Sequence, residues 1–146
     1  MTQLVLPSDT NNLGTIFGGT VMSWIDIAAA ISAGKHARAI VVTASLDALH
    51  FLAPIKLGDV VYIRAMVNFA ARTSMEVGVR VTSENQLTGE LTHTSSAYLT
   101  FVAVDAAGKP TPVPPLVPET EEEIRRFQQA AERKSRRLDE CARKRR

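Results

Sequence analysis

Hydrophobic residues change their spacing along this 146-residue chain. From about Gly19 to His36 they occur all round a helical turn, which predicts a buried core helix. After this segment the period becomes two, as in half-buried strands, with turn residues between the apolar runs. The predicted strands cover residues 40–51, 60–69, 74–82 and 90–105, and a short first strand covers 3–6 and ends before a proline.

This order predicts an α+β domain in which a curved antiparallel sheet wraps around one central helix. The length is sufficient for one domain with a real core. Four long strands and one helix leave one sheet face and one edge uncovered. Pairing with a second copy of the chain is the simplest way to cover them.

The end of the chain has a different composition. Residues 111–118 contain four prolines and predict an extended connector. Residues 119–146 predict a charged helix or tail that begins with a capping box, with Thr120 as N-cap and Glu123 at the third helical position. Apolar residues are sparse along it, so we expect the helix to dock at its start and to fray afterwards.

Charge and cysteine content narrow the function classes. Residues 119–146 hold ten Lys/Arg and seven Asp/Glu, whereas residues 1–118 hold seven and eight. The basic excess lies in a tail with interspersed glutamates and one aromatic residue, which argues against nucleic-acid binding. A single cysteine, Cys141, allows no intrachain disulfide, and no signal peptide is recognisable. We expect a cytoplasmic protein without membrane insertion, because Val21–Ala33 is too short to span a bilayer.

Asp26 is the main candidate for chemistry. It is the only charged residue between Asp9 and Lys35, and it lies inside the predicted core helix. A carboxylate in apolar surroundings is costly unless neighbours hold it, so it is a candidate acid or base. The alternative is a helix carboxylate that reaches solvent or caps a loop. The glycine turn before the helix favours the functional interpretation.

That turn runs from Asn11 to Gly19 and contains Asn12 and Gly18. Backbone amides at a helix N-terminus can stabilise a carbonyl that acquires negative charge. Either asparagine can be a plain turn residue or can aim its amide at a water or a carbonyl. The glycines match neither a dinucleotide fingerprint nor a P-loop, because the required G-x-G-x-x-G and Gly-Lys-Ser/Thr patterns are missing.

Other chemistry is poorly supported. His36, His50 and His93 are dispersed and form no metal-ligand spacing, so we expect no metal. There is no G-x-S-x-G nucleophile elbow. Cys141 lies in a charged helix, which is a poor setting for a catalytic thiol.

Several blocks in order resemble the hot-dog-fold acyl-CoA thioesterases, both the bacterial single-domain enzymes and each half of the two-domain cytosolic animal enzymes. The resemblance covers about residues 3–127. The ordered series is more specific than any single block. The blocks are Pro7–Gly19, Met22 with Trp24–Asp26, Val42–Ser45, Phe51–Pro54, Gly58–Asp59, Thr73–Val77, Leu87–Glu90, Ala97–Val102, Gly108–Pro110 and Pro114–Glu121.

The resemblance implies a hot-dog domain over residues 1–110. It also implies hydrolysis of acyl-CoA to a free acid and CoA, without a metal or redox cofactor. Two copies would pair edge to edge, commonly within a trimer of dimers. The active site would lie between copies, with Asn11 from one and Asp26 from the other. Asp26 would be the base for an attacking water, and the amides of Gly18 and Gly19 would bind the oxyanion.

The acyl chain is expected beside Trp24 and Met22. Because CoA carries phosphates, Lys56 and Arg72 are the expected cations on its path, and the expected channel residues are Thr73, Ser74 and Met75. Three other classes are an acyl-CoA-binding protein without turnover, a hot-dog hydratase or dehydratase, and an interaction protein that acts through its tail. Asp26 argues against the first, and the lack of a histidine near the helix start argues against the second.

Overall fold

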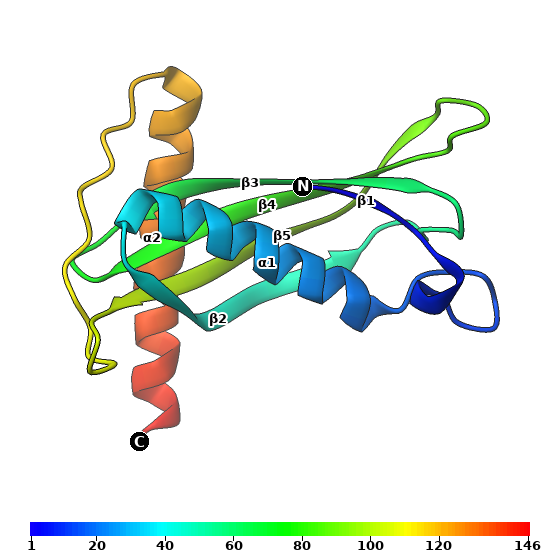
Figure 1. Cartoon of the computed structure of the whole chain (residues 1–146). Coiled ribbons are helices and arrows are strands. Elements are labelled where there is room, and N and C mark those ends of the chain that lie inside the picture. Colours follow the sequence, from blue (N-terminus) through cyan, green and yellow to red (C-terminus); the bar gives the residue numbers. More distant parts are fainter.

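The computed structural model describes residues 1–146, except for the side chain of Ala48. It contains one antiparallel sheet with the strand order β1-β3-β4-β5-β2 and two long helices (Figure 1). The predicted α+β class, with a curved sheet around one helix and a further C-terminal helix, is confirmed. The strands are β1 Thr2–Leu4, β2 Ile40–Phe51, β3 Val60–Ala70, β4 Ser74–Glu84 and β5 Leu91–Val104, and the helices are α1 Gly18–Ala37 and α2 Glu121–Lys144, with a short 3-10 turn at Pro7–Asp9.

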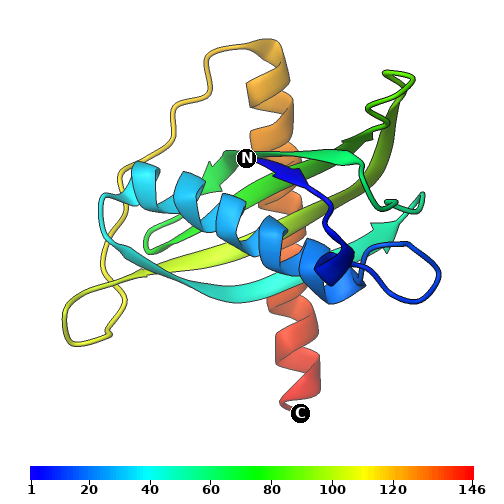
Figure 2. The same ribbon diagram turned by 45° about the vertical axis from the view of Figure 1, so that its right-hand side comes forward.

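The core lies between α1 and the concave face of the sheet. Alternate residues of the three central strands point toward the helix and are almost fully buried, as the period of two requires. Small residues on α1, namely Ala28, Ala29 and Ala33, let the helix approach the sheet closely. Figure 2 shows α1 lying along the strands inside the curve of the sheet.

Helix α1 is buried on one side only, which corrects the expectation of a fully buried core helix. Val21, Ile25 and Ala29 are buried, but Ile27 and Ile31 are 49% and 52% exposed. The sheet has a single concave face and covers only the side of the helix that faces it. An apolar stripe on the other side is therefore open in the single chain.

The two edges of the sheet differ in length. The β1 edge has three residues, whereas β2 has twelve and carries outward apolar side chains at Ile40 and Val42. Register shifts occur in β2 between Thr43 and Ser45 and between Asp47 and His50. Unpaired strands of this length are commonly covered by another chain.

Helix α2 does not fray after its first turn, contrary to the sequence-based expectation. It is continuous to Lys144 and crosses the convex face of the sheet from β3 toward β2 (Figure 1). The predicted capping box is present: the Thr120 side chain accepts a hydrogen bond from the backbone N–H of Glu123 at 3.1 Å. The Glu123 carboxylate accepts the backbone N–H groups of Glu119 and Thr120, which lowers the pKa of Glu123.

The middle of α2 is attached to the sheet by ion pairs rather than by a long apolar stripe. Arg133 donates two hydrogen bonds, at 2.6 and 3.0 Å, to Glu76, whose side chain is 1% exposed. Arg137 donates to Asp47 at 2.6 Å. Burial acts to lower the pKa of Arg133, but the hydrogen bond and charge of Glu76 outweigh it, so the pKa is raised. The prediction that only the start of α2 docks was therefore wrong, because it counted apolar residues and not these ion pairs.

Candidate active site

Asp26 lies in the third turn of α1 and is partly exposed. The hydroxyl of Thr43, on β2, donates a hydrogen bond of 2.7 Å to one of its carboxylate oxygens. Among the residues that the structure describes, Thr43 is its one hydrogen-bond partner, so the second carboxylate oxygen remains available to a water. The carboxylate is thus oriented by a neighbour and lies on the open side of the helix, next to the exposed Ile27.

Asn11 holds the turn that precedes α1. Its side-chain oxygen accepts the backbone N–H of Leu13 at 2.9 Å and that of Thr15 at 3.3 Å, and its amide nitrogen donates to the Thr15 hydroxyl at 3.0 Å. An amide nitrogen carries two hydrogens, so one remains for a further acceptor. The neighbouring Asn12 is exposed, and no side-chain hydrogen bond fixes it within the described chain. The structure therefore orients Asn11 and leaves Asn12 free.

The N-terminus of α1 has no side-chain cap. Its N-cap is Phe17, which offers no hydrogen-bonding side chain, and the N–H of Phe17 donates to the carbonyl of Asp9 at 3.0 Å. Gly18 and Gly19 occupy the first turn, where backbone N–H groups have no partner within the helix. A Cβ at Gly18 would lie 3.4 Å from the ring of Phe51. The glycines thus keep two donors accessible at the positive end of the helix dipole.

Lys56 lies at this same end of the molecule. Its neighbour Leu57 donates a backbone hydrogen bond of 2.9 Å to the carbonyl of Gly14, and Lys56 pairs with Thr15 in an isolated bridge. The side chain of Lys56 is exposed. Asn11, Gly18, Gly19 and Lys56 therefore form one group around the start of α1.

Arg72, Thr73 and Ser74 form a second group at the other end of the sheet. The carbonyl of Arg72 accepts the N–H of Val113, and Nε2 of His36, near the end of α1, lies 2.8 Å from the carbonyl of Pro114. A helix of 20 residues is about 30 Å long, so this group lies roughly a helix length from the first. The structure does not bring the two groups together within one chain.

Two predicted substrate contacts lie in the core. Trp24 is 9% exposed and Met75 is 1% exposed, and both pack between α1 and the sheet. Their side chains are turned away from the open surface of the single chain. Met22, which was expected together with Trp24 to lie beside the acyl chain, is 44% exposed on the open side of α1. Of these residues, Met22 is the one whose side chain is open at the surface of the chain.

Asp26 also lies far from the backbone amides of Gly18 and Gly19 in the same chain. Asp26 follows Gly18 by eight residues, which corresponds to about 12 Å along a helix. The carboxylate and the first-turn amides of the same helix are thus too far apart to act on one carbonyl group. Within one chain these two groups therefore form no single site.

Sequence reasoning did not single out Thr43, the hydrogen-bond partner of Asp26. Alternation along β2 places it on the concave face with Val41, but spacing alone gives no reason to pair it with Asp26. The block Val42–Ser45 in the family resemblance was the available signal. The Glu76–Arg133 pair was also missed, because its members are 57 positions apart.

The described residues contain no cluster of three or more His, Cys, Asp or Glu side chains suited to a metal ion. In the same part of the chain, neither helix has the length and apolarity needed to cross a bilayer.

The fold and the site together define a hot-dog thioesterase architecture. Residues 13–90 match the family model of the thioesterase superfamily. A Bacillus subtilis protein named an uncharacterized acyl-CoA thioester hydrolase is 50% identical over 139 residues, which is 92% of this chain and 81% of that protein. The chain belongs to the thioesterase superfamily, and the predicted family and enzyme class are confirmed.

Solved structures of related proteins support the same family. An apo-hexameric acyl-CoA thioesterase is 52% identical with a TM-score of 0.92, covering 97% of this chain and 91% of that one. An acyl-CoA hydrolase from Staphylococcus aureus, solved with butyryl coenzyme A, coenzyme A and coenzyme A disulfide, is 43% identical with a TM-score of 0.90, covering 99% and 88%. Further structures of that enzyme carry alanine in place of an aspartate, an asparagine or a threonine.

Proposed function

We propose that this protein hydrolyses acyl-CoA thioesters to a free acid and CoA, with a site shared between two copies of the chain. The observation that carries the proposal is the Asp26 carboxylate, held at 2.7 Å by Thr43 on the open side of α1. The similarity to acyl-CoA hydrolases supports the substrate class. A thiol-release assay on acyl-CoA substrates of graded chain length tests it directly.

The spacing of Asn11, Asp26 and Thr43 along the chain supports their assignment to the proposed site. In this chain Asn11 lies 15 positions before Asp26, and Thr43 lies 17 positions after it. The asparagine, aspartate and threonine replaced by alanine in the Staphylococcus aureus enzyme show the same spacings of 15 and 17. This agreement favours Asn11 over Asn12 and adds Thr43 to the proposed site.

In the proposed mechanism Asp26 removes a proton from a water molecule as the water oxygen attacks the thioester carbonyl carbon. The amides of Gly18 and Gly19 stabilise the developing oxyanion, and the free hydrogen of the Asn11 amide orients the water or the carbonyl. The carbon–sulfur bond then breaks, and CoA leaves as the thiol after it takes up a proton. Thr43 keeps one Asp26 oxygen oriented. In the alternative, the Asp26 carboxylate attacks the carbonyl carbon itself, CoA leaves, and a mixed anhydride forms. If water then opens the anhydride at the Asp26 carbonyl carbon, a single turnover in ¹⁸O-water labels Asp26.

The second copy supplies the missing part of the site. The β2 edge and the open side of α1 carry exposed apolar residues, including Val42 and Ile31. Antiparallel pairing of two β2 edges would bring the start of one α1 toward the middle of the other, and would bring Lys56 of one copy closer to Arg72, Thr73 and Ser74 of the other. We propose this dimer as the minimal active unit, within a trimer of dimers. Hexameric thioesterases among the similar structures support that assembly.

Replacing Asn11 and Asn12 one at a time shows which of the two side chains contributes to catalysis. We expect Asn11→Ala to lower kcat by about 100-fold, because the variant loses an oriented donor at the reacting carbonyl. Asn12→Ala is the matched control and should retain near wild-type kcat, since Asn12 is exposed. Steady-state kinetics measure both. The reverse ranking would show that the assignment of Asn11 is incorrect.

Mixing two inactive variants tests the shared site. Subunits with Asn11→Ala and subunits with Asp26→Asn are unfolded together and refolded in equal amounts. If each site takes Asn11 from one copy and Asp26 from the other, half of the dimers are mixed and each has one intact site, so activity returns to about a quarter of wild type. If both residues act within one chain, the mixture stays inactive, which would contradict the proposal.

A further inference from the structure

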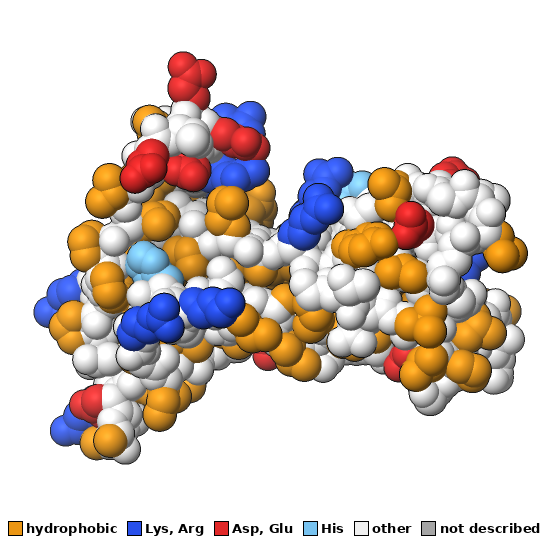
Figure 3. Space-filling model, turned by 45° about the horizontal axis from the view of Figure 1, so that its top comes forward, with side chains coloured by type: hydrophobic (Ala, Val, Ile, Leu, Met, Phe, Trp, Pro, Cys, Tyr) orange, Lys and Arg blue, Asp and Glu red, His pale blue; other side chains and the backbone are white. Residues whose placement is uncertain are grey.

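Helix α2 is longer than the part of the sheet that it crosses. Its 24 residues span about 36 Å, whereas the strands from β3 to β2 span about 14 Å. Figure 3 shows the carboxylates of its first turn standing out from the body of the molecule, and Figure 1 shows its other end beyond β2. Among the described residues, Arg137 is the last one of α2 with a side-chain hydrogen bond to the sheet, to Asp47 on β2. Residues 138–146, which we call the free end of α2, are all exposed.

The free end lacks the packing that normally holds a helix together. Most helical stability in proteins comes from burial of an apolar face, and short helical segments without it are marginal in water. Leu138 is nevertheless 60% exposed, and Cys141 and Ala142 follow it at helical spacing. We therefore expect a surface outside the single chain to cover this end.

Helical spacing fixes the directions in which the free end presents its side chains. Cys141 lies four residues after Arg137 and so shares the side that faces the plane of the sheet. Leu138 lies about three turns after Phe127 and shares its flank of the helix. The ring of Phe127 packs on Phe69 of β3, with the centroids 4.9 Å apart. Leu138 therefore points sideways along the sheet, on the flank that contacts Phe69.

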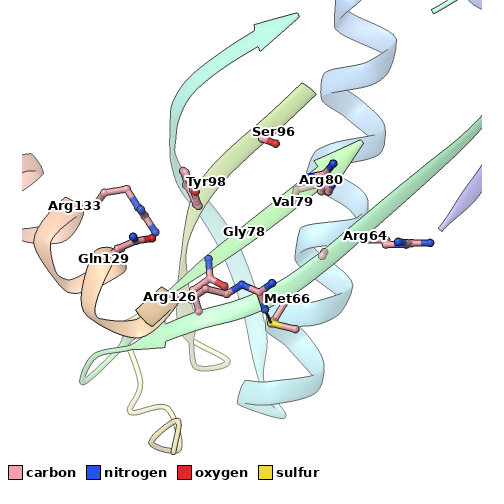
Figure 4. Close-up of a pocket in the computed structure, with 12 residues that line it drawn as sticks. Arg64, Met66, Gly78, Val79, Arg80, Ser96, Tyr98, Arg126, Gln129 and Arg133 are labelled. Carbon is pink, nitrogen blue, oxygen red and sulfur yellow. Dashed lines mark hydrogen bonds between the residues drawn. The ribbon is translucent and has the colours of Figure 1, made fainter. Parts of the chain in front are cut away.

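This flank of α2 faces the end of β5. Figure 4 shows the opposite flank, with Arg126 beside Met66 of β3. Phe69 follows Met66 on β3, so the flank that contacts Phe69 faces the end of that strand. Because β3 and β5 both pair antiparallel with β4, they run in the same direction. Leu138 thus points toward the side of the convex face where β5 ends.

An apolar patch lies on the convex face at that side. Thr43 and Phe101 are cross-strand partners that point to the concave face, where Thr43 contacts Asp26 and Phe101 is buried. The pairs that alternate with them therefore point to the convex face. They form what we call the β2–β5 patch, which consists of Ile40 opposite Val104 and Val42 opposite Val102. Ile40 is 66% exposed and Val42 is 47% exposed, so the patch is open beside α2.

Two-fold symmetry brings a second α2 to this patch. If two β2 edges pair antiparallel along their full length, the axis passes the middle of the strand, between Ser45 and Leu46. The partner's Asp47 then lies opposite position 44 of this chain, three residues from Asp47 toward the patch. Three residues of a strand span about 10 Å, which is the distance at which two helices pack. The partner's α2 therefore crosses beside this one, in the opposite direction and on the patch side.

From this arrangement we propose that the free end of α2 docks on the partner subunit, against the partner's α2 and the partner's β2–β5 patch. The axis runs half a strand spacing beyond β2, about 2.4 Å, which is one to two residues of α2 after Arg137. Leu138 therefore packs against the partner's Leu138 near the axis, and Cys141 faces the patch. The proposal rests on the pairing of β2 edges proposed above and not on the chemistry at Asp26. Each copy covers the open face of the other, and this exchange of helix ends holds the dimer together.

A single cysteine per chain tests the contact between the two helices. The variant Cys141→Ala with Leu138→Cys carries its only thiol at the expected contact, so mild oxidation should convert most of the chain into a covalent dimer on a non-reducing gel. The control is Cys141→Ala with Glu140→Cys, because position 140 lies about 200° around the helix from position 138 and points away from the partner's helix. It should give little dimer. Equal dimer formation in both variants would reflect collision of exposed thiols and would overturn the inference.

A pair of thiols tests the patch. A short bis-maleimide should join native Cys141 of one copy to Val42→Cys of the other. It should not join Cys141 to Leu87→Cys, which lies in the exposed turn between β4 and β5. Val42→Cys with Cys141→Ala shows how much product arises from position 42 alone. If that variant gives as much product, Cys141 does not face the patch and the proposed docking is incorrect.

Leu138→Ser measures how much the free end contributes to the dimer. We expect the dissociation constant of the pair to rise about 10- to 100-fold, because both copies lose a buried leucine. Glu140→Ser is the matched control and should change it less than about fivefold. Analytical ultracentrifugation over a dilution series measures both. At chain concentrations above the dissociation constant, Leu138→Ser should keep wild-type kcat, and an unchanged dissociation constant would contradict the proposal.

The results separate this inference from the proposed reaction. Suppose that the mixture of Asn11→Ala and Asp26→Asn subunits regains activity, but position 138 gives no cross-link and Leu138→Ser leaves the dissociation constant unchanged. The docking of α2 is then overturned, the shared site stands, and another molecule, such as a copy from a second dimer, covers the patch. An inactive mixture that still cross-links at position 138 contradicts the shared site and supports the docking.

Discussion

Asp26→Asn is expected to lower kcat for acyl-CoA hydrolysis by about 10²- to 10⁴-fold, the range typical of general-base assistance. The amide keeps the size of the side chain and can still accept the hydrogen bond from Thr43, but it cannot take a proton from water. The Tm should change by no more than a few degrees, because Asp26 is only partly buried. Stopped-flow or steady-state thiol release gives kcat, and thermal unfolding gives Tm.

Asp139→Asn is the matched control for that variant, because Asp139 is exposed on α2 and lies outside the proposed site. It should keep wild-type kcat. Full kcat in Asp26→Asn would refute the proposed role of Asp26 as the base. A loss of activity accompanied by dissociation of the oligomer would instead assign Asp26 to assembly, so the oligomeric mass is measured alongside.

Arg133→Ala is expected to destabilise the chain by about 3 kcal/mol, because it leaves the Glu76 carboxylate buried without its bidentate partner. Arg137, at 3.7 Å from Glu76, compensates in part. The corresponding decrease in Tm is about 10 °C for a domain of this size. Denaturant unfolding at fixed protein concentration measures the change.

Two further variants make this test specific. Arg136→Ala on the exposed side of α2 should change the free energy of unfolding by less than about 0.5 kcal/mol. Replacing Glu76 and Arg133 together by methionine should recover most of the stability, since no unpaired charge then remains. If Arg133→Ala unfolds no earlier than Arg136→Ala, the buried pair contributes nothing to the docking of α2.

The elements with a clear period were predictable. The alternation of Met75, Val77, Val79 and Val81 placed β4 correctly, and Thr120 with Glu123 placed the start of α2. These signals are local, because a period or a cap involves residues a few positions apart. The half-exposure of α1 was not predictable in the same way, since Ile27 and Ile31 are apolar whether a sheet or a second chain covers them.

The site residues remain predictions, and the chain suggested them only where a local pattern is informative. An isolated charge in an apolar helix made Asp26 a candidate. The turn before the helix left Asn11 and Asn12 open, and only the family resemblance selected Asn11. The Asp26–Thr43 hydrogen bond depends on which strand the fold places beside α1, and periodicity cannot supply that. Likewise, the docking of α2 through Glu76 arises from strand order, because an arginine in a charged helix resembles any solvated residue until a partner is known.

The proposed division of the site between two copies, which follows from the distance along α1 between Gly18 and Asp26, has a consequence for regulation. A catalyst whose two halves lie on separate polypeptides obeys mass action, so its specific activity depends on dilution. At chain concentrations below the dissociation constant of the dimer, the rate of product formation would be proportional to the square of the chain concentration. The abundance of the chain would then act as a threshold, and a small molecule bound to the β2 edge would inhibit by preventing the two copies from pairing.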